Sequence, residues 1–318
     1  MRITLFFISV FVFSSCLKEE SPVSKRNAGD IITNEVNLTN SYQYQLYFDL
    51  STNKMVSKNV KTIWDIAFHN GSDKNVILNG AKIMEVYSTN TTQMSAILDT
   101  VGLTLNPNFD MPSGRLDSTA IGDWQDGLVR IVNLGISPDG TPQGIYKIKI
   151  TTATADSYTF IYAPLSSTDF TELTITTDSD HSFTYFNLRE NKVVEVAPIK
   201  TDWDIQFTEY THIFYQPYYT SYLVVGCLTN HYNTKSIALY DVDFDNIDIE
   251  MASSLDLSSD INNIGYDWKT FDGNQYTVDP TITYVIQDSE GYFYKLRFIS
   301  YYSPNGAKGN PVFEFQQL

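Results

Sequence analysis

An internal duplication, marked by the tryptophans, constrains this chain more than any other feature. The segments YFDL (47–50), NKMV (53–56) and KTIWDIAF (61–68) recur in the same order as YFNL (185–188), NKVV (191–194) and KTDWDIQF (200–207). Further along, IGDW (121–124) matches IGYDW (264–268), and YKIKI (146–150) matches YKLRF (294–298). All four tryptophans therefore fall into matched pairs, Trp64 with Trp203 and Trp124 with Trp268. Self-similarity of this kind predicts two divergent copies of one structural unit.

The matched segments alternate apolar and polar residues, which is the period of a β-strand. In the two WDI-x-F segments, the tryptophan, isoleucine and phenylalanine share one face, which we expect to lie in the core. Tyrosine and phenylalanine, with 22 and 19 residues, both favour strands. The expected fold class is all-β with few short helices, built as two related β units. Strands are expected at 41–50, 144–151, 157–162, 182–188, 282–287, 292–301 and 311–315.

The first residues have the order of a bacterial lipoprotein signal. Arg2 precedes an apolar run from 3 to 13, and two serines precede Cys16. Such an order predicts a signal peptide over 1–15, cleaved before Cys16, which would carry the lipid with acyl chains such as palmitate. An ordinary secretory signal is the alternative. The charged segment LKEES (17–21) resembles the export tag of surface lipoproteins, so we expect a surface-exposed position on the outer membrane, held by the lipid alone.

The remaining chain divides into a tether and two units. Residues 16–35 are polar, contain Pro22 and are expected to be a flexible tether. The first unit is expected at 36–172 and the second at 173–318, which is the proposed ligand-binding copy.

The charge and the motifs exclude several functions. Removal of 1–15 takes away Arg2, so 20 basic and 37 acidic residues remain, a net charge of −17. A surface this acidic repels phosphate backbones, so nucleic acid is not an expected partner. Because Cys16 is expected to carry the lipid, Cys227 is the only free cysteine, which leaves no intramolecular disulfide and no cysteine-based zinc site. The sequence has no serine nucleophile elbow, P-loop or HExxH motif, so we expect a binding protein and not an enzyme.

A resemblance to a known family rests on an ordered series in the second unit. WDIQF (203–207) is followed by YVIQ (284–287), a turn at 288–291, YKLRF (294–298), Gly309 and FEF (313–315). With the lipoprotein start, this series resembles the HmuY family of surface lipoproteins that capture haem, most clearly over 185–318. The resemblance implies an all-β fold that grips haem between loops through two axial side chains, histidine or methionine. It also implies haem or a haem-carrying host protein as partner, and an outer-membrane haem receptor.

The second unit carries an aromatic insertion that the first lacks. From Trp203 to Gly226 it is seven residues longer than the first unit is from Trp64 to Gly80. The extra length lies within 209–222, which contains one histidine and six aromatic residues. Haem needs flat apolar walls and a neutral imidazole or thioether for its iron. The expected haem-binding residues are His212 and His231 as axial ligands, with Tyr215, Tyr218 and Tyr219 as walls.

Simpler roles remain open for each of these residues. Aromatic residues in β proteins mostly pack across strands, and a surface histidine is mostly solvated. His69 and His181 are expected at the surface. Three methionines are alternative soft ligands or core fillers: Met84, Met111 and Met251.

The sequence thus predicts a non-enzymatic, lipid-anchored surface protein that binds haem for iron acquisition. The alternative is a carbohydrate-binding or adhesive module without haem, in which the exposed aromatic rings stack on sugars. A purely structural surface subunit is a third possibility. Titration with haemin and glycan binding distinguish the three.

Overall fold

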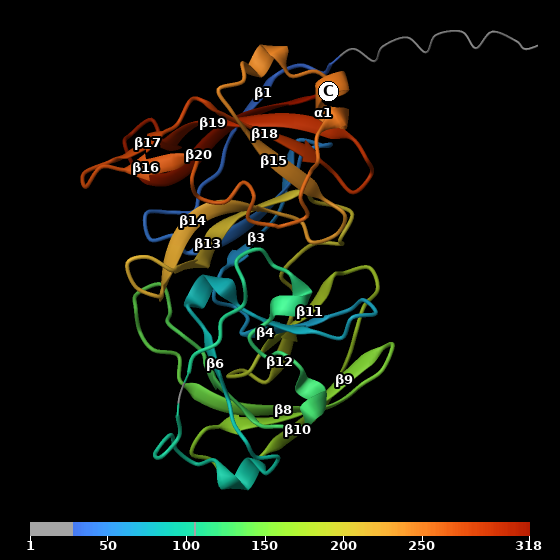
Figure 1. Ribbon diagram of the computed structural model, residues 1–318, viewed down its shortest axis with the longest axis vertical. Helices are drawn as coiled ribbons and strands as arrows, with labels where there is room; N and C mark the ends of the chain where they lie inside the picture. The colour runs from blue at the N-terminus through green and yellow to red at the C-terminus, as the bar shows by residue number, and fades with distance from the viewer. Residues whose placement is uncertain (1–27, 105) are drawn as a thin grey trace, which may run out of the picture.

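The alternating segments form strands, and the strands gather into two β bodies stacked along the long axis of the molecule (Figure 1). The computed structural model describes residues 28–104 and 106–318. The expected signal peptide, Cys16 and the tether as far as residue 27 lie outside the described residues. Within the described part, no helix is long and apolar enough to cross a membrane.

The upper body in Figure 1 packs a four-stranded sheet on a five-stranded sheet. Its core contains Phe313, whose ring meets Phe48 at 5.4 Å and Phe207 at 5.2 Å between centroids. The first sheet has the order β14 (Thr220–Thr229), β13 (Ile205–Phe214), β2 (Tyr44–Asp49), β3 (Lys54–Val60). The second has the order β1 (Ile32–Glu35), β20 (Lys308–Gln317), β19 (Phe293–Tyr302), β18 (Ile282–Gln287), β15 (Lys235–Tyr240).

Residues 32–35, expected in the tether, form β1. They pair with β20, and Ile32, opposite Phe315, packs against the core of the upper body.

The lower body repeats the arrangement. Phe68, Phe160 and Phe186 are fully buried at its centre. Its four-stranded sheet has the order β12 (Lys192–Val194), β11 (Phe183–Asn187), β4 (Ile66–His69), β5 (Val76–Leu78). Its five-stranded sheet has the order β10 (Thr171–Thr176), β9 (Ser157–Pro164), β8 (Ile145–Ala153), β7 (Arg130–Asn133), β6 (Glu85–Ser88).

Helices are short, as expected for this composition. One α-helix occurs in the described part of the chain, α1 (Ile249–Ser254). A small hairpin, β16 (Lys269–Phe271) with β17 (Tyr276–Val278), projects from the upper body. Among the described residues, the 3-10 helices are Gly80–Lys82, Met94–Ala96, Leu116–Ser118, Trp124–Asp126 and Phe244–Asn246. The predicted fold class, all-β with two related units, is confirmed.

Each body takes one hairpin from the other sequence repeat. The hairpin β2–β3, from the first repeat, joins the upper body, where Phe48 lies opposite Ile205 of β13. The hairpin β11–β12, from the second repeat, joins the lower body, where Phe186 lies opposite Ile66 of β4. Each of the two four-stranded sheets therefore contains strands of both repeats.

The aspartates of the two WDI-x-F segments fasten these exchanged hairpins. Asp204 accepts a hydrogen bond from the Leu50 backbone N–H at 2.8 Å, at the end of β2. Asp65 accepts one from the Leu188 backbone N–H, also at 2.8 Å, at the end of β11. Both contacts are buried, so each carboxylate satisfies a backbone donor that water cannot reach.

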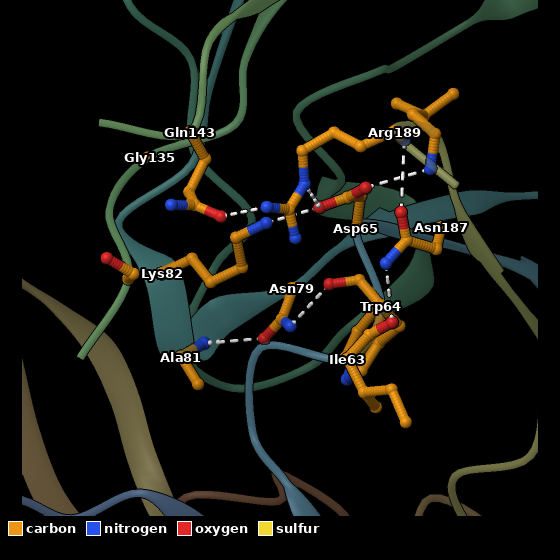
Figure 2. A network of polar contacts seen from close by, with 12 residues as sticks. Ile63, Trp64, Asp65, Asn79, Ala81, Lys82, Gly135, Gln143, Asn187 and Arg189 are labelled. Carbon is orange, nitrogen blue, oxygen red and sulfur yellow. Dashed lines mark hydrogen bonds and ion pairs between the residues drawn. The ribbon is translucent and has the colours of Figure 1, made fainter. Parts of the chain in front are cut away.

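Asp65 has cationic partners (Figure 2). It forms an ion pair with Lys82 in which both side chains are fully buried, and Arg189 Nε lies 3.9 Å from it. Asn79 stabilises the turn that leads into β4, because its side-chain N–H donates to the Trp64 carbonyl at 2.8 Å.

The equivalent position in the second repeat has acidic neighbours instead. Burial raises the pKa of Asp204 to about 7, and the nearby carboxylates of Asp288 and Asp49 add to the rise. We call Asp65 and Asp204 the latch aspartates. They differ in how their charge is compensated: Asp65 in the lower body is paired with Lys82, whereas Asp204 in the upper body takes up a proton near neutral pH.

Candidate ligand-binding site at the seam

Matched aromatic residues line the seam between the bodies. Trp64 meets the edge of Tyr185 at 4.9 Å, and Trp203 meets Tyr47 at 4.8 Å. Because the hairpins are exchanged, each tryptophan contacts a tyrosine of the other repeat. T-shaped contacts of this kind are favourable beyond the area they bury.

The tryptophans lie apart from the rest of the WDI-x-F segment. Ile66 and Phe68 enter the core of the lower body as expected. Trp64 belongs to the seam cluster instead, because β4 begins only at Ile66 and the alternation of a strand does not extend back to it.

A cavity of about 140 Å³ lies in this seam. That is room for roughly five water molecules, at about 30 Å³ each. The loop 109–115 forms one wall. Other walls are mainly apolar and include Trp64, Leu78, Met84, Phe183, Tyr185 and Trp203.

Polar groups close one side of the cavity. Gln206 donates from Nε2 to the Tyr47 hydroxyl at 3.1 Å and to Gln45 Oε1 at 3.3 Å. Lys61 and Glu209 form a largely buried ion pair beside them, and burial lowers the pKa of Lys61 to about 8. These groups satisfy one another, so they shape the wall without requiring a ligand.

The loop 109–115 is fastened at its base by Asp110. The carboxylate accepts hydrogen bonds from the Leu78 N–H at 2.6 Å and the Ala120 N–H at 2.7 Å. Burial raises the pKa of Asp110 to about 6. Beyond this clip, the loop carries Met111 and Gly114 along the cavity.

His231 lies in the cavity wall. Its ring meets Phe183 at 5.1 Å, and a Cβ placed on Gly114 would lie 2.7 Å from its Cε1. Burial lowers the pKa of His231 to about 4, with a smaller contribution from His69. The imidazole is therefore neutral at pH 7, which is the state that ligates iron. Met84 and Met111 line the same cavity, so two thioethers accompany this imidazole.

His212 lies elsewhere, on β13 opposite Tyr222. Its ring is packed between Phe214 at 4.7 Å and Tyr266 at 5.0 Å, and its Nδ1 is buried without a hydrogen-bond partner. Burial lowers its pKa, opposed by Asp267.

The structure does not bring the two predicted ligands together. Ile205 pairs with Thr229, two residues before His231, at one end of the β13–β14 hairpin. His212 lies seven residues further along β13, toward the other end. Seven strand residues span roughly 23 Å. Each histidine therefore stays a separate prediction.

The predicted aromatic wall lies at the tip of the β13–β14 hairpin, which the insertion makes longer than its sister β4–β5. Tyr215, Tyr218 and Tyr219 are between 56% and 79% exposed. The Tyr215 hydroxyl lies 4.0 Å from Met111 Sδ, and the Tyr219 ring lies 6.2 Å from Phe109. The tip thus rests against the loop that walls the cavity.

The remaining histidines have other partners. His69 Nδ1 lies 2.6 Å from the Asp73 carbonyl, and His181 pairs with Asp178 in an exposed turn. In 28–104 and 106–318, no group of three or more His, Cys, Asp or Glu residues is arranged to hold a metal ion. The loop 109–115 and the seam tryptophans were not predicted as cavity walls, although the tryptophan matches were a signal for the latter.

Comparison with known proteins gives one family and several distant structures. The family model described as HmuY protein matches residues 41–135 and 179–315. No curated protein matches the chain.

Three solved structures are similar over most of their length. Apo PinO from Porphyromonas gingivitis is 9% identical to this chain. The match covers 91% of this chain and 97% of the PinO chain, with a TM-score of 0.30. An HmuY-like haem-binding protein from Bacteroides vulgatus has 12% identity, 90% coverage of each chain and a TM-score of 0.25. An apo HmuY analogue from Tannerella forsythia has 9% identity, coverage of 92% and 98%, and a TM-score of 0.27. At these scores the likeness in shape is weak.

The family match covers most of the chain and both repeats. It includes the two matched tryptophan pairs, the latch aspartates Asp65 and Asp204, and the imidazole of His231. This protein belongs to the HmuY family.

Proposed function

We propose that this protein captures haem without chemical turnover, as a lipid-anchored protein of the outer-membrane surface that serves iron acquisition. Family membership supports haem as the ligand class. The observation that carries the proposal is His231, a neutral imidazole in the wall of an aromatic cavity between the two bodies.

The chemistry of the lining suits an iron porphyrin. Haem iron takes neutral imidazole and thioether ligands, and the macrocycle needs flat apolar walls. His231 supplies the imidazole, and Met111 is the thioether on the facing loop. The seam residues Trp64, Trp203 and Tyr185 supply aromatic walls.

The size of the cavity sets a condition. Room for about five waters is less than a porphyrin occupies. Haem therefore enters only when the loop 109–115 moves away from the seam. This movement breaks the hydrogen bond from the Ile261 N–H to the Ser113 carbonyl at 2.9 Å, whereas the contacts of the loop with the hairpin tip, through Tyr215 at 4.0 Å and Tyr219 at 6.2 Å, are long. We propose that these tyrosines and Tyr218 then border the bound ligand, and that His212 remains a second candidate on the same hairpin.

The remaining assignments follow from the sequence. Cys16 is the proposed lipid attachment site. Haem or a haem-carrying host protein is the proposed source, and an outer-membrane haem receptor is the proposed recipient. Alanine at Cys16 should abolish labelling by a palmitate analogue in cells.

Titration of the mature soluble chain with haemin tests the proposal. We expect a saturable Soret band that shifts or weakens in His231→Ala and in Met111→Leu. His181→Ala is the matched control, because that histidine is in an exposed turn, and it should bind as the parent does. If His212→Ala alone removes the band, the ligand site moves to the hairpin tip. A flat titration of the parent protein refutes haem binding.

A further inference from the structure

The matched tryptophans Trp124 and Trp268 have different surroundings. Trp268 is only 1% exposed and stacks on Phe298 at 3.9 Å, with the two planes 11° apart. Tyr301 meets it at 5.7 Å, and the β16–β17 hairpin covers Tyr301 through Tyr276 at 4.8 Å. The second repeat thus seals its tryptophan under an aromatic stack.

The first repeat lacks this cover. Trp124 is followed after six residues by β7 at Arg130, whereas Trp268 is followed after fourteen by β18 at Ile282. The eight missing residues correspond to the β16–β17 hairpin. At the position of Phe298 the first repeat has Ile150, which offers no stacking ring.

An open pocket of about 460 Å³ borders Trp124 where the second repeat is filled. The indole is fixed in place, because its Nε1 donates to the Lys74 carbonyl at 2.5 Å. The pocket shares no lining residue with the seam cavity. It is lined by Trp124, Gln125, Gly127, Lys149 and residues 150–153.

The rim of this pocket carries hydrogen-bonding groups. Gln125 and Thr152 have exposed side chains, an amide and a hydroxyl. Lys149 also lines the pocket, and its ammonium donates a hydrogen bond to the Thr92 carbonyl at 3.1 Å. The aromatic side chain of Trp124 is therefore bordered by residues that carry an amide, hydroxyls and an ammonium.

We propose that the pocket beside Trp124 binds a pyranose unit of a glycan. A sugar ring has an apolar C–H face, which packs on an indole, and hydroxyls around its edge, which need donors and acceptors in the plane around it. The mixture of one aromatic surface and several neutral polar groups matches that ligand better than it matches an apolar molecule. This site is independent of haem capture and gives the first repeat a binding role of its own.

Tryptophan fluorescence of the mature chain tests the proposal. Trp64, Trp203 and Trp268 are 7%, 6% and 1% exposed, so acrylamide quenches chiefly Trp124. The probes are a panel of methyl glycosides of glucose, galactose, mannose and N-acetylglucosamine, and an oligosaccharide array. At least one sugar should protect the fluorescence from acrylamide. The double variant Gln125→Ala/Thr152→Val should weaken that sugar's binding by roughly 5- to 150-fold, because two hydrogen bonds to the ligand are lost.

Two further measurements separate binding from folding. The double variant changes exposed side chains, so its melting temperature should equal that of the parent. Haemin binding should also be unchanged in it, because the seam cavity has other walls. The proposal fails if no sugar on the panel or the array binds, or if binding is unaffected by both the double variant and Trp124→Phe.

Discussion

Replacement of Asp204 by asparagine should stabilise the protein above pH 7 and remove much of the pH dependence of its unfolding. The carboxyl is 5% exposed, and burial raises its pKa from 3.8 to about 7. Folding therefore favours the protonated form. The contribution of protonated Asp204 to the free energy of unfolding is fully present below about pH 4 and is lost as the pH rises through 7.

The magnitude follows from the shift. About three pKa units correspond to roughly 4 kcal/mol of unfolding free energy lost between pH 4 and pH 8. Asparagine has no charge to bury, and its side-chain oxygen can still accept the N–H of Leu50. We expect Asp204→Asn to be more stable than the parent by about 2–4 kcal/mol near pH 8 and nearly equal to it near pH 4.

Chemical denaturation at both pH values measures this difference. Asp65→Asn is the matched contrast, because Asp65 is paired with the fully buried Lys82. Removal of that carboxylate leaves a buried ammonium unpaired, which should cost about 3–5 kcal/mol at neutral pH. Equal destabilisation of the protein by both substitutions near pH 8 would refute the argument that the two latches differ in charge compensation.

Other predictions concern the cavity and the core. Gly114→Ala should lower the melting temperature and alter the haemin spectrum, because φ is +71° there and the new Cβ would lie 2.7 Å from His231 Cε1; calorimetry and absorbance measure the two effects. Tyr215→Ala should speed haemin association in stopped-flow measurements without loss of stability, because the tyrosine contacts the loop at Met111 from an exposed position. Phe186→Ala should cost about 3–5 kcal/mol in denaturant unfolding, because the ring is fully buried among the strands of the lower body. An unchanged association rate would refute the second of these, and a loss under about 1 kcal/mol would refute the third.

Local sequence pattern predicted the strands well. Alternation placed 282–287 at the bounds of β18, and the aromatic runs of β19 and β20 were found to within a few residues. The tryptophan matches predicted two related units. These features are local or repeated, so periodicity and self-comparison detect them.

The exchange of hairpins was beyond such reasoning. YFDL and YFNL are nearly identical, so the apolar pattern of either hairpin would suit pairing with either of the two WDI-x-F strands. The choice is decided by distant contacts, such as Asp204 with Leu50, which local pattern does not encode. The same limit applies to the proposed ligand site. His231 was a candidate by residue type, but Met111, the proposed thioether ligand, lies 120 positions earlier in the chain.

The crossed hairpins also bear on how such a protein evolves. A duplicated gene usually tolerates loss of one copy, because the survivor folds alone. Here, deletion of either repeat would leave the remaining four-stranded sheet without two strands and expose a hydrophobic edge. Both copies are therefore needed to complete the two sheets, while their surfaces differ, one with a sealed tryptophan and the other with an open one.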